Sequence, residues 1–339
     1  MSVMDLLNAL TAFANFVLIP ATAYGAQLAL GALGVTLVYG VLRFSNVAHG
    51  DTMAFGTMVT ILLTWALQES GVTLGSLPTA LLALPAGIVV TAALVLGTDR
   101  LVYRFYRARR VRPVVFVIVS VGVMFVMNGL VRFIIGPGDQ RFADGERFIV
   151  SAREFRDWSG LREGLALKTS QAITVVTAIL VVVLLFWFLK RTRMGKSMRA
   201  YSDNEDLALL SGIDPNRVVA VTWIILAALA TVAGVLYGLD KSFKPFTYFQ
   251  LLLPIFASAI VGGLGSPPGA IAGGFLIAFS EVTVTYAWKK VLVYLLPDPL
   301  EPTALVQLLS TDYKFAVSFL ILTAVLLIRP TGIFAGRAE

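Results

Sequence analysis

Polar residues that could do chemistry are concentrated in residues 43–51, which read Arg-Phe-Ser-Asn-Val-Ala-His-Gly-Asp between two long apolar stretches. This segment places an amide, an imidazole and a carboxylate close together, on Asn46, His49 and Asp51. Such groups are costly in lipid, so they usually face a bundle interior or water. Gly50 would let the chain break, and Asn46 or Asp51 could cap a helix end. Two interpretations follow: an ordinary cytoplasmic turn with solvated polar groups, or a broken-helix element near a substrate path.

A second polar segment, residues 190–216, contains the signature of a short helix. Ser202, followed three residues later by Glu205, fits a capping box with Ser202 as the N-cap. Gly212 suits the position after the helix, and Asp214-Pro215 fits the start of the next one. The pattern predicts a helix over residues 203–211 that exposes leucines. This helix would either lie on the membrane interface or dock a soluble partner.

The remaining motifs do not support catalysis. Gly195-Lys196-Ser197 is similar to the end of a phosphate-binding loop, but the glycine required five residues earlier is Lys190. The chain has no cysteine, and His49 is its one histidine, so thiol and Ser-His-acid mechanisms are excluded and a metal or haem site is not expected. We therefore predict that the chain is not an enzyme and does not itself hydrolyse ATP.

Composition places the elements that carry these segments in a membrane. Hydrophobic residues make up 58% of the 339 residues, and charged residues only 14%, against about 25% in soluble domains. The mean hydropathy is +0.83. These values exclude a soluble or nucleic-acid-binding protein. The net charge of +7 is typical of basic cytoplasmic loops and contact with anionic lipid. The first basic residue is Arg43, so a cleavable signal peptide is not expected.

Long stretches without a charged residue predict the membrane spans. They cover residues 6–42, 52–68, 70–98, 113–131, 169–189, 218–239, 245–280 and 315–328. Their continuous apolarity favours helices over barrel strands. We predict one all-α domain, residues 1–339, a polytopic bundle of about 8–10 transmembrane or partly spanning helices. Stretch 6–42 could hold two helices or one kinked span, while the glycines and prolines of 262–269 divide the seventh stretch into segments near 250–262 and 268–287.

Basic clusters predict the orientation. Arginines are frequent in residues 100–112, and lysines and arginines in residues 190–199, so both segments should be cytoplasmic. Residues 136–169, with six basic and six acidic residues, should form an external loop, and 190–216 a cytoplasmic one. The tail that follows Ile328 should lie inside. The N-terminus should then be inside if residues 6–42 hold two spans and outside if they hold one.

Ionisable residues inside the predicted spans are few, with Asp51 and Glu281 the available acids. Proton- or sodium-coupled carriers more often contain relays of such groups. For Glu281 we expect a structural role, as an ion-pair partner or near the outer boundary of its span.

Five segments, kept in order along the chain, resemble the branched-chain amino acid ABC transporter permeases, specifically the LivH-like member of the LivH/LivM family. They are residues 37–51, 198–218, 233–240, 262–274 and 329–334, which read LVYGVLRFSNVAHGD, MRAYSDNEDLALLSGIDPNRV, AGVLYGLD, GGLGSPPGAIAGG and RPTGIF. The match covers nearly the whole chain. The chain departs from the family in a long N-terminal apolar segment, residues 6–24.

The resemblance implies an importer subunit in a bacterial-type cytoplasmic membrane. Its expected partners are a second permease, two ABC ATPases, an external solute-binding protein and membrane lipid, with no nucleic acid. It implies no cofactor on this chain, since ATP and Mg²⁺ belong to the ATPases. The family's ATPase-contact segment maps onto residues 198–213, and its signature covers Asn46, His49, Gly50 and Asp51. The coupling residues implied are Ser202, Glu205, Asp206, Leu207, Leu210 and Gly212.

Two alternatives to an importer of branched-chain or related hydrophobic amino acids stay open. The same group includes importers of urea and short-chain amides. A self-sufficient secondary transporter or channel would need no ATPase, so a docking role for the helix predicted at 203–211 would argue against it.

Overall fold

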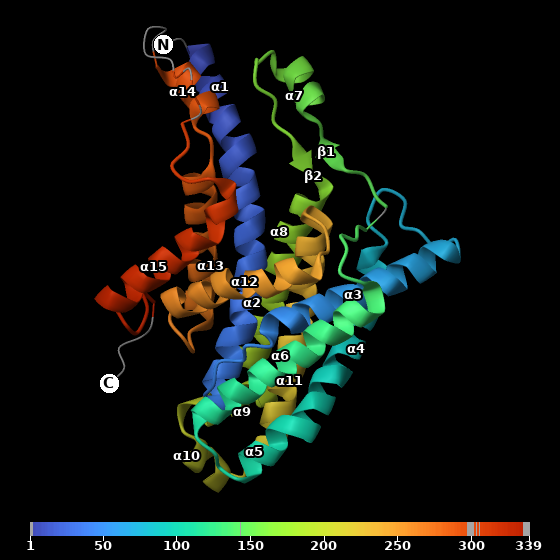
Figure 1. The fold of residues 1–339 in the computed structure, drawn as a ribbon, viewed down its shortest axis with the longest axis vertical. Coiled ribbons are helices and arrows are strands. Elements are labelled where there is room, and N and C mark those ends of the chain that lie inside the picture. The colour runs from blue at the N-terminus through green and yellow to red at the C-terminus, as the bar shows by residue number, and fades with distance from the viewer. Residues whose placement is uncertain (1–2, 143, 297–301, 303, 305, 335–339) are drawn as a thin grey trace.

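The structure is a computed structural model that describes residues 3–142, 144–296, 302, 304 and 306–334. Residue 143, in the predicted external loop, and both ends of the predicted 1–339 domain lie outside the described residues. Across the described residues the chain is almost entirely helical, and nine helices or helical runs are long and apolar enough to span a membrane (Figure 1). The predicted all-α polytopic bundle is confirmed.

The elements follow one another along the chain with short connections. The first half contains α1 (Val3–Phe13), the π-helical turn η1 (Ala14–Leu18), α2 (Ile19–Leu42), α3 (His49–Glu69), α4 (Ala80–Thr98), the π-helical turn η2 (Asp99–Tyr103), α5 (Arg104–Ala108), α6 (Pro113–Ile135), β1 (Phe148–Val150) and α7 (Ala152–Ser159). The second half contains β2 (Leu167–Lys168), α8 (Thr169–Arg191), α9 (Arg193–Asp203), α10 (Glu205–Leu210), α11 (Pro215–Asp240), α12 (Pro245–Gly262), α13 (Pro267–Thr285), α14 (Lys289–Leu295), the 3₁₀ turn η4 (Thr311–Tyr313) and α15 (Lys314–Ile328). β1 and β2 pair antiparallel.

The first apolar stretch forms one continuous helical run, Val3–Leu42, rather than two spans. Pro20 stands in the first turn of α2, and the π-helical turn before it absorbs the hydrogen bond that proline cannot donate. At 40 residues the run is about 60 Å long, roughly twice the hydrocarbon thickness of a bilayer. Its first part, α1, packs against α14 through Ala9, Ala12 and Val291.

The glycine- and proline-rich turn divides its apolar stretch as predicted, between α12 and α13. Gly263 and Gly265 adopt positive φ angles of 104° and 85°, which glycine tolerates without strain. α13 begins with prolines in its first turn, and the Ser266 hydroxyl accepts a hydrogen bond from the Gly269 amide. The two helices then run antiparallel in close contact. The predicted boundaries were too short at the start of α12, which begins at Pro245.

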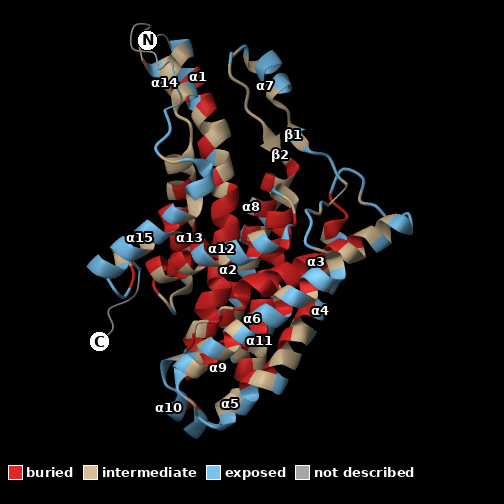
Figure 2. Ribbon diagram, in the orientation of Figure 1, coloured by how far each residue is buried: buried red, intermediate tan, exposed pale blue. Residues whose placement is uncertain are grey.

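Burial is concentrated in the middle of the bundle, around α2, α3, α11, α12 and α13 (Figure 2). In the most apolar part of the first run 83% of residues are buried inside the chain, against 11% for the Thr311–Ile328 run. α2 is hydrophobic all round, which fits a helix covered on every side. α6, α8 and α15, in contrast, expose large apolar side chains, as expected for helices that face lipid or another subunit.

The connecting segments gather at two opposite ends of the bundle (Figure 1). One end, named here the α10 end, carries α5, α9 and α10, and so joins the two basic segments of the sequence. The other, the α7 end, carries α7, the β1–β2 pair and the start of α1. Asn8 fixes α1 to this region, since its Oδ1 accepts hydrogen bonds from the amides of Arg162 and Glu163, at 2.9 and 3.0 Å.

Gly273 of α13 tests the close packing of the α12–α13 hairpin. A Cβ at Gly273 would overlap the Ser258 carbonyl, whereas Gly129 of α6 has open space at the same position. We expect Gly273→Ala to lower the free energy of unfolding by about 1–3 kcal/mol, because the hairpin must open for the methyl group. The matched control, Gly129→Ala, should leave stability unchanged or slightly higher. Thermal unfolding of both purified variants in detergent measures this, and equal midpoints would contradict the packing.

Candidate functional site

The 43–51 segment folds back into the bundle instead of forming a surface turn. α2 ends at Leu42, and Arg43 takes a left-handed conformation, with φ of 57°, that reverses the chain. α3 then starts at His49, whose ring Cε1 lies 2.7 Å from the position a Gly34 Cβ would occupy. Gly34 is two turns before the end of α2, so α3 begins inside the bundle. The side chain of His49 is fully buried. The broken-helix interpretation therefore describes this segment, and the solvated-turn interpretation is wrong.

The polar groups of this segment are held by contacts within the chain. Asn46 Oδ1 accepts hydrogen bonds from the Ala48 amide at 3.2 Å and the Tyr103 hydroxyl at 3.4 Å. The Ser120 hydroxyl accepts one from the Val47 amide at 3.1 Å. Neither ring nitrogen of His49 has a hydrogen-bond partner among the described residues. A buried imidazole in this state is costly, which makes His49 a candidate to contact a ligand or water.

Asp51 connects the broken helix to α6. Its Oδ1 accepts a hydrogen bond from the Asn128 amide nitrogen at 2.7 Å, while Oδ2 has no partner in the described part of the chain. The carboxylate lies in the first turn of α3, where the positive end of the helix dipole favours negative charge. The predicted capping role is wrong for both Asn46 and Asp51, since the N-cap of α3 is Ala48 and no side chain caps it.

Gly50 brings α3 against α12. A Cβ at Gly50 would lie 2.6 Å from the Tyr248 carbonyl oxygen, so a larger residue would push the two helices apart. The Tyr248 hydroxyl in turn donates a hydrogen bond to the Gly234 carbonyl of α11, at 2.8 Å. The predicted signature residues therefore meet at a junction of α2, α3, α6 and α12.

An aromatic cluster that the sequence reasoning missed extends this junction. The rings of Phe44, Tyr103 and Trp223 stack in succession, with centroids 5.5 and 5.2 Å apart. Trp223 Nε1 donates a hydrogen bond to Asp99 Oδ1 at 2.8 Å, and Arg107 pairs with the same carboxylate through both terminal nitrogens, at 2.7 and 3.0 Å. The signal in the sequence is Asp99, an acid at the start of the basic 100–112 segment.

The helix predicted at 203–211 is α10, which is shorter and has a different N-cap. Ser202 belongs to α9, and Asn204 is the N-cap of α10, accepting a hydrogen bond from the Leu207 amide at 3.0 Å. The predicted capping box is therefore wrong: the Glu205 carboxylate accepts a hydrogen bond from the Tyr201 hydroxyl, at 2.6 Å. Burial, together with this bond, raises the pKa of Tyr201.

The end of α10 follows the prediction closely. Gly212 has a φ of 79°, and its amide and that of Ile213 donate to the Leu209 and Ala208 carbonyls in a Schellman motif. The Asp214 side chain caps α11, accepting from the Asn216 amide at 2.9 Å. Of the remaining predicted coupling residues, Asp206 is exposed, and Leu207 and Leu210 are 60% and 85% exposed. This pair of leucines forms the apolar tip of α10.

Ser202 brings the two predicted segments together. Its hydroxyl donates a hydrogen bond to the Gly40 carbonyl at 2.9 Å, and the Arg43 guanidinium donates to the Ser202 carbonyl. α9 is thereby fixed to the last turn of α2. A pocket of about 600 Å³ opens beside this contact at the α10 end, lined by Tyr39, Arg43, Asp203, Leu264, Ser266 and Pro330.

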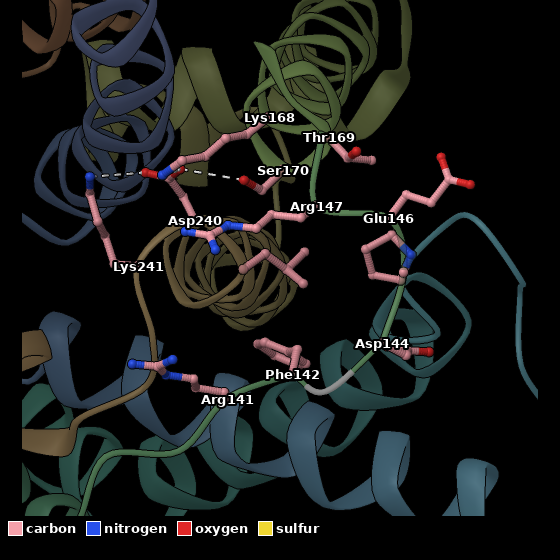
Figure 3. Close-up of a pocket in the computed structure, with 13 residues that line it drawn as sticks. Arg141, Phe142, Asp144, Glu146, Arg147, Lys168, Thr169, Ser170, Asp240 and Lys241 are labelled. Carbon is pink, nitrogen blue, oxygen red and sulfur yellow. Dashed lines mark hydrogen bonds and ion pairs between the residues drawn. The ribbon is translucent and has the colours of Figure 1, made fainter. Parts of the chain in front are cut away.

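A pocket of about 700 Å³ lies at the α7 end and is lined by side chains of both charges (Figure 3). Asp240 stands at its centre of charge, with Lys168 Nζ at 3.8 Å, Lys241 Nζ at 3.3 Å and the Ser170 hydroxyl donating at 3.4 Å. The loop after α6 supplies further charged side chains, including Arg141 and Arg147. This charged pocket was not predicted, because its residues come from four separate connections.

Comparison with known proteins gives one consistent result. Residues 18–326 match the family model "Branched-chain amino acid transport system / permease component". The chain is 30% identical over 323 residues to the high-affinity branched-chain amino acid transport system permease protein LivH of Salmonella typhimurium, with 93% of each chain covered. It is 30% identical over 318 residues to BraD of Pseudomonas aeruginosa, again with 93% of each covered. It is 29% identical over 310 residues to a probable LivH of Methanocaldococcus jannaschii, covering 91% and 89%.

Among solved structures, PsaBC from Streptococcus pneumoniae in complex with Fab aligns over 96% of this chain and 92% of that chain. The TM-score is 0.45 and the identity 13%, a likeness too low to carry an argument.

The Asp51–Asn128 hydrogen bond can be tested by exchange of the two residues. Asn128→Leu removes the donor and leaves a buried carboxylate unsatisfied, so we expect the free energy of unfolding to fall by about 1–3 kcal/mol. The double variant D51N/N128D rebuilds an amide–carboxylate bond in reverse and should recover most of this loss. Thermal unfolding of the purified proteins compares them. A double variant no more stable than Asn128→Leu would argue against a direct bond.

Proposed function

The chain belongs to the family of permease components of branched-chain amino acid transport systems, and we propose that it is the transmembrane subunit of an ATP-driven importer of branched-chain amino acids. It is a multi-pass membrane protein. In this proposal a second permease completes the substrate path, two ABC ATPases supply the energy, and an external binding protein delivers the substrate. The membrane is a bacterial-type cytoplasmic membrane, and this chain binds no cofactor.

The orientation we propose follows the positive charge. The α10 end carries the basic segments 100–112 and 190–199, so it faces the cytoplasm. The continuous helical run Val3–Leu42 counts as one span, which puts the N-terminus outside. The tail after α15 lies at the cytoplasmic side, where the Ile333 amide donates to the Val261 carbonyl beside the α12–α13 turn. The charged pocket of Figure 3 then faces the external binding protein.

The observation that carries the coupling to ATPases is the apolar tip of α10, Leu207 and Leu210. A six-residue helix that projects two largely exposed leucines gains little from solvent, but it fits an apolar groove on a soluble partner. Its capped ends keep it rigid without help from neighbours. A secondary transporter would have no need of such a helix.

The contact between α9 and α2 gives the docking helix a route into the membrane. α10 follows α9 after the single residue Asn204, and Ser202 and Arg43 fix α9 to the end of α2. Because α2 is buried among the other helices, a displacement of α10 by the ATPases would move the centre of the bundle. This is the alternating-access mechanism we propose, with the broken helix at residues 43–51 next to the moving contact.

The proposal predicts a defined complex and a defined cargo. We expect a tagged copy, purified in mild detergent from its native membrane, to retain a second permease and two ATPases. Liposomes that contain this complex and its binding protein should accumulate L-leucine only with ATP, and neither urea nor acetamide. Uptake of urea or acetamide in place of leucine would support the amide importer. Recovery of this chain alone, under conditions that preserve a known ABC complex, would support the secondary transporter or channel.

The apolar tip of α10 predicts the docking contact. Leu210→Asp should abolish association with the ATPases while insertion in the membrane stays normal, because a charge cannot enter an apolar groove unpaired. Leu308→Asp, at a leucine that is 76% exposed near the opposite end, is the matched control and should leave association unchanged. Co-purification measures both. Normal recovery of both ATPases with Leu210→Asp would show that α10 is not their docking site.

A further inference from the structure

A small pocket lies between α2, α11, α13 and α15, towards the α7 end. Its volume is about 240 Å³, below the roughly 300–1,000 Å³ of pockets for drug-sized ligands, so it suits a smaller molecule. The residues that line it include Phe16, Tyr24, Tyr237, Glu281, Tyr286 and Lys314. The walls are thus mainly aromatic, with one carboxylate and, from Lys314, an ammonium group.

The carboxylate of Glu281 is buried and incompletely bonded. The residue is 1% exposed, and its Oε1 accepts a hydrogen bond from the Ser318 hydroxyl. Oε2 has no hydrogen-bond partner in the described part of the chain. The expected structural ion pair is not found there: no ion pair joins Glu281 to Lys314 within 4.0 Å, although both line the pocket. A buried carboxylate oxygen in this state is costly unless a donor arrives from elsewhere.

The charges of the pocket are separated in the way that a zwitterion requires. Glu281 comes from α13 and can accept a hydrogen bond at Oε2. Lys314 stands at the start of α15, while the other lining ammonium, Lys241, is already paired with Asp240 at 3.3 Å. Phe16 and Tyr286 stack with ring centroids 6.0 Å apart and give an apolar wall. One acceptor, one cation and aromatic walls together fit a small molecule with an ammonium, an anion and an apolar group.

We propose that this pocket binds a free amino acid with an apolar side chain. In this arrangement the ligand's ammonium donates to Glu281 Oε2, its carboxylate accepts from Lys314, and its side chain packs on the aromatic rings of Phe16, Tyr24, Tyr237 and Tyr286. The choice of an amino acid rests on the proposed function; the charges and the walls are features of the pocket itself. The headgroup of phosphatidylethanolamine shares the ammonium–anion chemistry and is the source that the experiment must separate.

The place of the pocket fits a site on the route of the substrate. Lys241 lines both this pocket and the charged pocket of Figure 3, so the two are neighbours at the same end of the bundle. Tyr24 and Tyr237 stand on α2 and α11, two of the most buried helices. A molecule delivered to the charged pocket would therefore have the smaller pocket next to it.

Binding of radiolabelled L-leucine to the membrane-embedded complex, without its external binding protein, tests the proposal. The complex is placed in nanodiscs of phosphatidylglycerol, which has no ammonium group. Unlabelled L-leucine should compete, whereas leucinol, which lacks the carboxylate, and 4-methylpentanoate, which lacks the ammonium, should each compete about tenfold or more weakly. Wild-type complex that binds no leucine, or binds all three ligands equally, would overturn the proposal.

Two variants assign the charges to residues. Glu281→Gln should weaken L-leucine binding about tenfold or more and leave 4-methylpentanoate unchanged, because that ligand has no ammonium to lose. Lys314→Met should weaken L-leucine and leave leucinol unchanged. The controls are Asp139→Asn and Lys244→Met, exposed residues that do not line the pocket, and both should bind as wild type.

The other outcomes each contradict a different part. Equal loss of all three ligands, together with a lower unfolding midpoint that E281Q/K314M restores, would show a structural pair and no ligand site. Displacement of leucine when phosphatidylethanolamine is added, lost in Glu281→Gln, would assign the pocket to lipid. ATP-dependent leucine uptake by the wild-type complex with unchanged binding in both variants would overturn this site and leave the proposed function intact. Leucine binding without any uptake would do the reverse.

Discussion

Helices in a membrane gain little from apolar contact with one another, because lipid is as apolar as their side chains, so close packing at small residues must hold them. α2 meets this constraint with glycines that face different neighbours. The closest approaches to the position of a Cβ are 2.6 Å from Phe275 at Gly25, 2.9 Å from Ile255 at Gly31, 2.7 Å from His49 at Gly34 and 3.3 Å from Ser202 at Gly40. These contacts belong to α13, α12, α3 and α9. The other helices are therefore positioned against α2.

The same constraint explains why polar residues occur where they do. A chain that reverses inside the bundle must satisfy its backbone and side chains without water. In the 43–51 segment, Ser120 and Asn46 accept the amide hydrogen bonds that no helix provides, and Asn128 satisfies one oxygen of Asp51. Groups left over, such as the His49 ring and Glu281 Oε2, are the exceptions among buried polar atoms of the described residues. Exceptions of this kind are expected at sites that meet a ligand or water rather than in the packed core.

The sequence predicts what local chemistry decides. Continuous apolarity predicts the spans, Gly212 and Asp214 predict the end of α10 and the start of α11, and glycine density predicts the α12–α13 turn. It fails where a distant contact wins: Ser202 fits a capping box locally, but its hydroxyl donates to Gly40, and Asn204 takes over the cap. The pocket around Glu281 lies beyond such reasoning, because its walls come from helices more than two hundred residues apart. No local pattern records which helices meet.

The continuity of α2 has a consequence for how the two ends of the protein act together. Tyr24, in the wall of the small pocket, and Gly40, at the α9 contact, lie on one uninterrupted helix, about 24 Å apart along its axis. A hydrogen-bonded helix buried on all sides shifts or tilts as a unit more readily than it bends, because packed neighbours resist local deformation. α13, which carries Glu281, is joined instead to the α12 turn and the C-terminal tail. A shift of α9 would therefore change the distance between Tyr24 and Glu281, and with it the pocket, without any need for the two ends to touch.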